Sequence, residues 1–145
     1  MNRRHLSIWF LALALTPLVL TLGACAPTTA TTSLPLRYLA SPDALFDTLV
    51  REAPRRHVVV NPYGGQFELV AENREVGIVS LAYDLEDLYG PARQTATFQL
   101  FDNHDGTVSV VTAAATTSRL GYPLMAEELV RQMFALLDGR FQRLR

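Results

Sequence analysis

The sequence predicts an α+β domain in which two helices cover one face of an antiparallel sheet of about five or six strands. Several short segments alternate apolar and polar residues, which is typical of strands with one buried face. Two longer segments carry apolar residues at helical spacing, and such a stripe must be buried against another layer. Short turns join the predicted strands, so neighbouring strands are expected to be antiparallel. We therefore expect a two-layer sandwich.

Two segments are predicted to form the helices. Ser41-Pro42-Asp43 is a helix start, because the serine accepts from first-turn amides and proline suits the first helical position. Pro54 ends this helix, and the second runs from Pro123 to Gly139. The apolar stripes consist of Leu45, Phe46, Leu49, Val50 and Ala53 in the first helix, and of Met125, Leu129, Met133, Leu136 and Leu137 in the second.

Six segments are predicted as strands from alternation or from β-branched content. They are 36–40, 57–61, 67–71, 76–83, 95–100 and a strand that starts at Val108. Turns are expected at 62–65, 73–74 and 102–106, where glycine, proline and asparagine gather. The segment 84–93 is predicted to be a polar loop, and it is the longest irregular stretch expected in the domain.

The first 25 residues predict an exported protein. Arg3 and Arg4 precede an uncharged apolar run from Leu6 to Leu22, and small residues lead to Cys25, the only cysteine of the chain. A basic start, an apolar run and a small-residue cleavage site are typical of a secretory signal. The 145 residues therefore divide into a signal peptide at 1–24, a tether at 25–33 and a single α+β domain at 34–145.

The motif Leu22-Gly23-Ala24-Cys25 resembles the lipobox of bacterial lipoproteins. The resemblance implies cleavage before Cys25 and attachment of a diacylglycerol to its sulfur, and so an anchor in a membrane of the cell envelope. This places the domain outside the cytoplasmic membrane or at the outer membrane. Two alternatives remain, an uncleaved membrane helix and a plain secretory signal, which would leave one free thiol.

The segment that follows Cys25 is predicted to be a flexible linker. Residues 26–33 are rich in threonine, carry no charge and show no apolar periodicity. Such a segment would hold the domain at a distance from the membrane without fixing its orientation.

The mature domain also resembles helix-grip domains. The resemblance rests on the segment 38–49, in which a strand runs into a Ser-Pro-Asp helix start with Phe46 behind it, and on the terminal helix at 126–134. In layout the chain is similar to the BamC-like accessory domains of outer-membrane assembly. These resemblances imply a fold and carry no functional residue over to this sequence.

The sequence predicts no metal site, cofactor or enzymatic activity. His57 and His104 lack converging ligands, and the segment 102–106 departs from a calcium loop because His104 interrupts the order of acidic residues. Asp84, Glu86 and Asp87 lie in the predicted polar loop, where solvated carboxylates are expected. The chain has 13 basic and 14 acidic residues, so no nucleic-acid partner is expected.

The expected function is a non-catalytic protein-interaction or accessory module that binds an envelope protein. The alternative is a carrier or sensor of a small apolar ligand, held in a groove between the C-terminal helix and the sheet. The residues expected to contact a partner or ligand are Tyr63, Tyr83, Tyr89, Met125, Leu129 and Met133.

Overall fold

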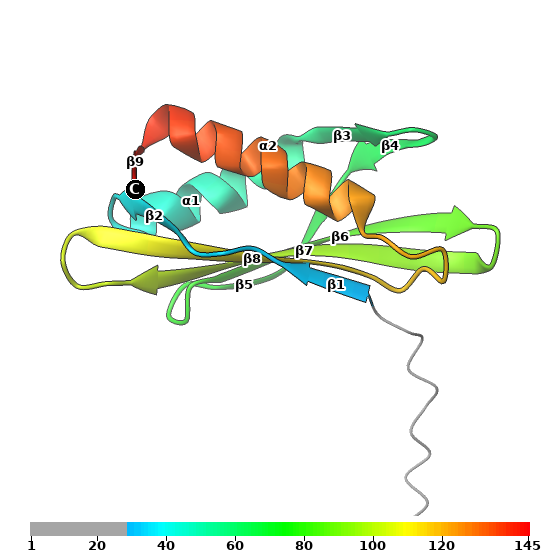
Figure 1. Cartoon of the computed structure of the whole chain (residues 1–145), viewed down its shortest axis with the longest axis horizontal. Coiled ribbons are helices and arrows are strands. Elements are labelled where there is room, and N and C mark those ends of the chain that lie inside the picture. The colour runs from blue at the N-terminus through cyan, green and yellow to red at the C-terminus, as the bar shows by residue number, and fades with distance from the viewer. Residues whose placement is uncertain (1–28) are drawn as a thin grey trace, which may run out of the picture.

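A computed structural model describes residues 29–145, in which a curved antiparallel sheet lies beneath two helices (Figure 1). The strands are β1 (Thr29–Thr32), β2 (Leu36–Leu39), β3 (His57–Val60), β4 (Tyr63–Gln66), β5 (Glu68–Asn73), β6 (Ile78–Asp87), β7 (Gly90–Asp102), β8 (Thr107–Thr116) and β9 (Gln142–Leu144). The helices are α1 (Pro42–Glu52), a short 3-10 turn η1 (Ala53–Arg55) and α2 (Leu124–Arg140). The predicted α+β class, with both helices on one face, is confirmed.

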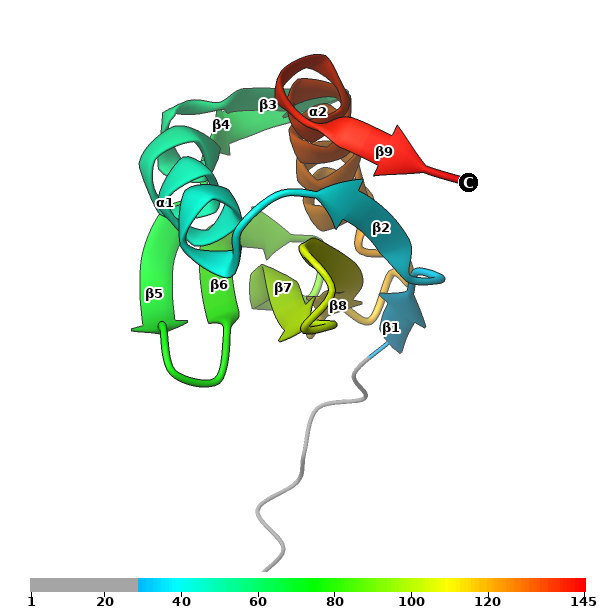
Figure 2. The same cartoon turned by 90° about the vertical axis from the view of Figure 1, so that its left-hand side faces the viewer.

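The main sheet contains seven strands within the described residues. Its order is β5-β6-β7-β8-β2-β9, and β1 pairs with the same edge of β8 as β2 does. Figure 2 shows α1 and α2 above this sheet, with β2 and β9 curving up beside α2. β3 and β4 form a separate two-stranded sheet, which Figure 1 places beside α2.

The predicted linker is wrong for residues 29–33. Thr29–Thr32 form β1, which pairs with residues 113–116 of β8, and the Ser33 amide donates to the Thr112 carbonyl at 2.9 Å. Threonine favours strands, and the edge of β8 offers backbone groups that need partners. The sequence Thr-Ala-Thr-Thr gives no apolar contrast, so periodicity missed this strand. The predicted signal peptide at 1–24, Cys25 and residues 26–28 of the predicted linker lie outside the described part of the chain.

The predicted polar loop at 84–93 is also wrong. β6 continues to Asp87 and β7 begins at Gly90, so only a tight turn separates them. Asp84 lies opposite Arg93, and the guanidinium donates to both carboxylate oxygens at 2.6 and 2.9 Å. Cross-strand pairs of opposite charge suit the solvent side of a sheet. Asp84 and Glu86 lie on the exposed side of this hairpin, whereas Asp87 lies on the side that carries Leu85.

Both predicted helix starts are confirmed. The Ser41 hydroxyl accepts from the Ala44 amide at 3.2 Å, and Pro42 occupies the first turn of α1. α2 begins at Leu124, directly after Pro123, and runs one residue past Gly139. The turn predicted at 62–65 is displaced, because Tyr63–Gln66 form β4 and the connection from β3 is made by Asn61 and Pro62.

The core lies between the helices and the concave face of the sheet. Its largest fully buried side chains are Tyr38, Phe67, Phe98, Leu45, Leu49, Leu81, Met125, Leu129, Met133 and Leu137. The buried Tyr38 hydroxyl donates to Asp138 of α2 at 2.8 Å, and burial raises the pKa of Tyr38. This bond joins β2 to the C-terminal part of α2 and satisfies the hydroxyl.

Candidate functional site

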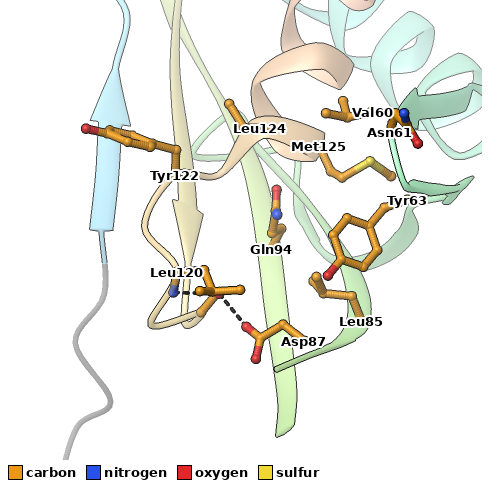
Figure 3. A pocket seen from close by; sticks show the side chains of 11 residues that line it. Val60, Asn61, Tyr63, Leu85, Asp87, Gln94, Leu120, Tyr122, Leu124 and Met125 are labelled. Atoms are coloured by element: carbon orange, nitrogen blue, oxygen red, sulfur yellow. Dashed lines mark hydrogen bonds between the residues drawn. The ribbon is translucent and has the colours of Figure 1, made fainter. Parts of the chain in front are cut away.

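A pocket opens at one end of the domain, where three connections meet. These are the turn between β3 and β4, the end of the β6–β7 hairpin, and the loop from β8 to α2. The cavity measures about 150 Å³. Figure 3 shows the side chains that line it, which are Val60, Asn61, Tyr63, Leu85, Asp87, Gln94, Ser118, Leu120, Tyr122, Leu124 and Met125.

The pocket has a buried floor and an exposed apolar rim. Met125, Gln94 and Ser118 are almost fully buried. At the rim, Tyr122 is 70% exposed and Leu124 is 50% exposed. Apolar walls with a few polar groups are typical of binding sites, and exposed aromatic and aliphatic side chains around a cavity are what a binding partner would cover.

Gln94 places an amide at the floor of the pocket. Its Oε1 accepts from the Ala126 backbone amide at 3.0 Å. Pro123, which precedes α2, offers no side-chain cap, so Gln94 of β7 caps the helix from the sheet. This bond fixes which end of the amide is oxygen, since a backbone amide can only donate. Among residues 29–145 no group accepts from Nε2, which leaves a donor for an occupant of the pocket.

Asp87 and Ser118 tie the β8–α2 loop to the β6–β7 hairpin. The Ser118 hydroxyl donates to Asp87, and Ser118 in turn accepts from the Leu120 amide at 3.1 Å (dashed lines in Figure 3). The Tyr89 amide also donates to Asp87, at 2.7 Å. The Ser118 hydrogen bond, helped by the Tyr89 amide, holds the pKa of Asp87 below its usual range. Asp87 is therefore a structural anion in this site, not a proton donor at neutral pH.

The opposite wall of the pocket depends on Tyr83. Its ring lies 5.5 Å from the Phe67 ring, and its hydroxyl donates to the Gly64 carbonyl at 3.2 Å. A Cβ on Gly65 would lie 2.6 Å from the Tyr83 ring, so only glycine permits this approach. Tyr83 thereby holds the β3–β4 hairpin, and with it Tyr63, against the main sheet.

The structure divides the six residues expected to contact a partner or ligand. Tyr63 and Met125 line the pocket. Tyr89 is exposed at the tip of the β6–β7 turn, beside a second, polar hollow. Tyr83 packs under the β3–β4 hairpin, and Leu129 and Met133 are fully buried in the core. The groove expected along α2 is occupied by core side chains at Leu129 and Met133, and only its Met125 end reaches the pocket.

Gln94 and Ser118 were missed by sequence reasoning. The alternation that places Ala96, Phe98 and Leu100 inward also places Gln94 inward, one residue before the predicted start of that strand. A polar residue at an inward-facing strand position is unusual, so this pattern could have identified Gln94 as a candidate site residue. For Ser118 the sequence contains no local signal, because its partner Asp87 lies 31 residues away.

The residues considered for metal or acid–base chemistry do not converge. His57 is exposed at the start of β3, and Asp84 is paired with Arg93. In the β7–β8 turn, the carboxylates of Asp102 and Asp105 accept from backbone amides of that turn, at 2.8 and 3.1 Å. Within residues 29–145, no group of three or more histidine, cysteine or acidic residues is placed to hold a metal ion.

Two comparisons with known proteins find no match for this chain. No known protein family matches the chain, and a search of curated proteins finds no significant match. In the described residues, neither helix combines the length and apolar character needed to cross a membrane.

Proposed function

We propose that the protein is a lipoprotein of the cell envelope that binds a protein partner through the pocket at the end of its sheet. A diacylglycerol on Cys25 anchors it, as the similarity of residues 22–25 to a lipobox implies. The domain acts as a non-catalytic accessory module, located on the outside of the cytoplasmic membrane or at the outer membrane.

The size of the pocket is the observation that favours a protein partner over a small molecule. A cavity of about 150 Å³ is comparable to one that accepts a single benzene ring, at roughly 150 Å³, and is smaller than the roughly 300–1,000 Å³ typical of small-molecule sites. It fits one leucine or phenylalanine side chain. In protein interfaces, a few such anchors in well-packed pockets supply most of the binding energy.

The polar group at the floor fits the same partner. The free Nε2 donor of Gln94 can meet a backbone carbonyl next to the inserted side chain. The rim at Leu120, Tyr122 and Leu124 is exposed. The partner residues on either side of the inserted side chain would cover it. An apolar anchor with one hydrogen bond gives both affinity and orientation.

A second candidate is a small apolar ligand in the same pocket. The apolar walls formed by Val60, Leu85 and Met125 favour it. The volume restricts such a ligand to about the size of one ring, and a long acyl chain would require Leu129 and Met133 to leave the core.

Site-specific photo-crosslinking in the producing cell tests the partner. A photoreactive phenylalanine analogue replaces Leu124 at the rim, and Leu39 at the other end of the sheet is the matched control, because the two leucines are 50% and 51% exposed. We expect a discrete light-dependent protein adduct from position 124 only. Leu85→Trp, which fills the pocket from the facing wall, is expected to abolish it without lowering the melting temperature substantially.

Two results would contradict this proposal. Equal adduct patterns from positions 124 and 39 would show that the pocket is not a specific site. A stoichiometric small molecule in native mass spectra, displaced by Leu85→Trp and accompanied by no protein adduct, would support the ligand carrier instead.

A further inference from the structure

The chain enters the domain at the same end as the pocket. Thr29, the first residue of β1, lies opposite Thr116 at the end of β8, and Gln94 lies opposite Thr116 on the other side of β8. Thr29 and Gln94 are therefore at one level along the sheet. Beyond this level, the β6–β7 hairpin continues for four more residues of β7, from Gln94 back to Gly90 (Figure 1). At about 3.3 Å per residue, its tip extends roughly 13 Å past the point of entry.

The distance from Cys25 to this point is limited by the chain. Only three residues separate Cys25 from Thr29. Four steps of a fully extended chain span at most about 14 Å. A lipid on Cys25 would thus keep the start of β1 within about 14 Å of the bilayer surface, nearly the length by which the hairpin tip projects. With the strands directed toward the bilayer, the tip therefore reaches the membrane surface.

The side chains at the tip suit a membrane surface. Leu88 in the β6–β7 turn is 90% exposed, and Tyr89 beside it is also exposed. Leu120 in the β8–α2 loop adds a third apolar side chain at this end, about half exposed. Tyrosine is enriched at the membrane–water interface, where its ring is buried and its hydroxyl stays hydrated.

This end of the domain carries no excess of positive charge. Arg93 is paired with Asp84, and the remaining charged side chains are Glu86, Asp87 and Arg119, two acidic and one basic. A surface without excess positive charge has no electrostatic preference for anionic lipid. Contact would therefore come from apolar insertion and would change little with salt.

We propose that the tip formed by Leu88, Tyr89 and Leu120 contacts the lipid bilayer, so that the pocket opens at the membrane surface. This inference rests on the proposed lipid on Cys25. The lipid and the tip are two attachment points, which together restrict the orientation of the domain. The partner that reaches the pocket is then a membrane-embedded or membrane-bound protein.

The test uses the full lipoprotein in vesicles of zwitterionic phosphatidylcholine. A nitroxide label is placed at Leu88→Cys, and His104→Cys provides the matched control, because His104 is an equally open turn residue at the other end of β7. Cys25 has no free thiol once it carries a thioether, so only the introduced cysteine reacts. We expect the nitroxide at position 88 to be accessible to oxygen, which dissolves in the bilayer, and the nitroxide at position 104 to be accessible to a water-soluble nickel complex. Both accessibilities should stay the same at high salt.

The intact mass separates the two proposals. If Cys25 carries lipid and label 88 is as accessible to nickel as label 104, the membrane contact is wrong and the anchor stands. If the mass shows an unmodified Cys25, the proposed lipid anchor is wrong, and the membrane contact inferred from it is wrong as well. Lipid on Cys25 together with a label 88 shielded from nickel supports both.

Discussion

At the scale of single residues, Gln94 connects the fold to the site. Its oxygen caps α2 through the Ala126 amide, and its nitrogen faces the pocket. A buried amide oxygen must keep its hydrogen-bond partner, because leaving a buried polar atom without one costs free energy. The side chain that holds the start of α2 in place is therefore also the donor that an occupant would meet.

Removal of this cap should destabilise the protein. We expect Gln94→Leu to lower the free energy of unfolding by about 1–2 kcal/mol, since the Ala126 amide loses its acceptor. Urea denaturation measures the change. Thr95→Val, at the neighbouring outward-facing position, is the control and should stay within about 0.5 kcal/mol. A Gln94→Leu variant as stable as the control would mean that the cap contributes nothing.

At the scale of elements, the β3–β4 hairpin is a separate unit that the main sheet holds in position. Two-stranded sheets are marginal by themselves, so this hairpin needs its contacts with α2 and with Tyr83. The close approach of Gly65 to the Tyr83 ring provides such a contact. Because Val60, Asn61 and Tyr63 belong to this unit, the stability of the pocket wall depends on Tyr83.

Loss of the Tyr83 ring should loosen the hairpin before the rest of the domain. We expect Tyr83→Ala to reduce the local opening free energy of β3 and β4 by about 2 kcal/mol, which is ~30-fold faster amide hydrogen exchange there. Tyr83→Phe keeps the ring and loses only an exposed hydrogen bond, so its exchange should rise by about fivefold at most. Acceleration of equal size in β7 and β8 would show instead that the hairpin opens only with the whole domain.

At the scale of the whole molecule, β1 determines the end at which the chain enters the domain. Pairing with β8 takes Thr29–Thr32 out of the tether, and the chain enters at the end that holds the pocket. A short tether between the lipid and the domain would raise the effective concentration of the tip at the bilayer. Under the proposed lipid anchor, the pairing of β1 with β8 would therefore restrict the orientation of the domain.

A longer tether should release the tip. Twelve added Gly and Ser residues after Ala26 extend the segment before Thr29 about fivefold, and the ratio of lipid-bound to free tip should fall about tenfold. The nitroxide at Leu88→Cys reports this ratio. Replacement of residues 26–28 by Gly-Ser-Gly, without a change in length, is the control and should leave it unchanged. An unaffected ratio in the long variant would mean that the tip binds lipid without help from the tether.

Most of the elements could be predicted from local patterns. Period-two alternation found the central strands, and Ser41-Pro42-Asp43 located the start of α1, because these signals act over a few residues. β1, β4 and β9 were missed, and the β6–β7 hairpin was interrupted by a predicted loop. β1 and β9 depend on partner strands distant in sequence, as for Thr29 beside Thr116, and short polar strands carry little periodicity.

By itself, the sequence determined the α+β class, the two helices with their buried stripes, and the similarity of residues 22–25 to a lipobox. Only the tertiary structure decided where the pocket lies, that Gln94 and Ser118 belong to it, and that Leu129 and Met133 do not. The reason is physical: helix caps and alternating faces arise from neighbours along the chain, whereas a cavity is what remains between three connections that only the packed sheet brings together.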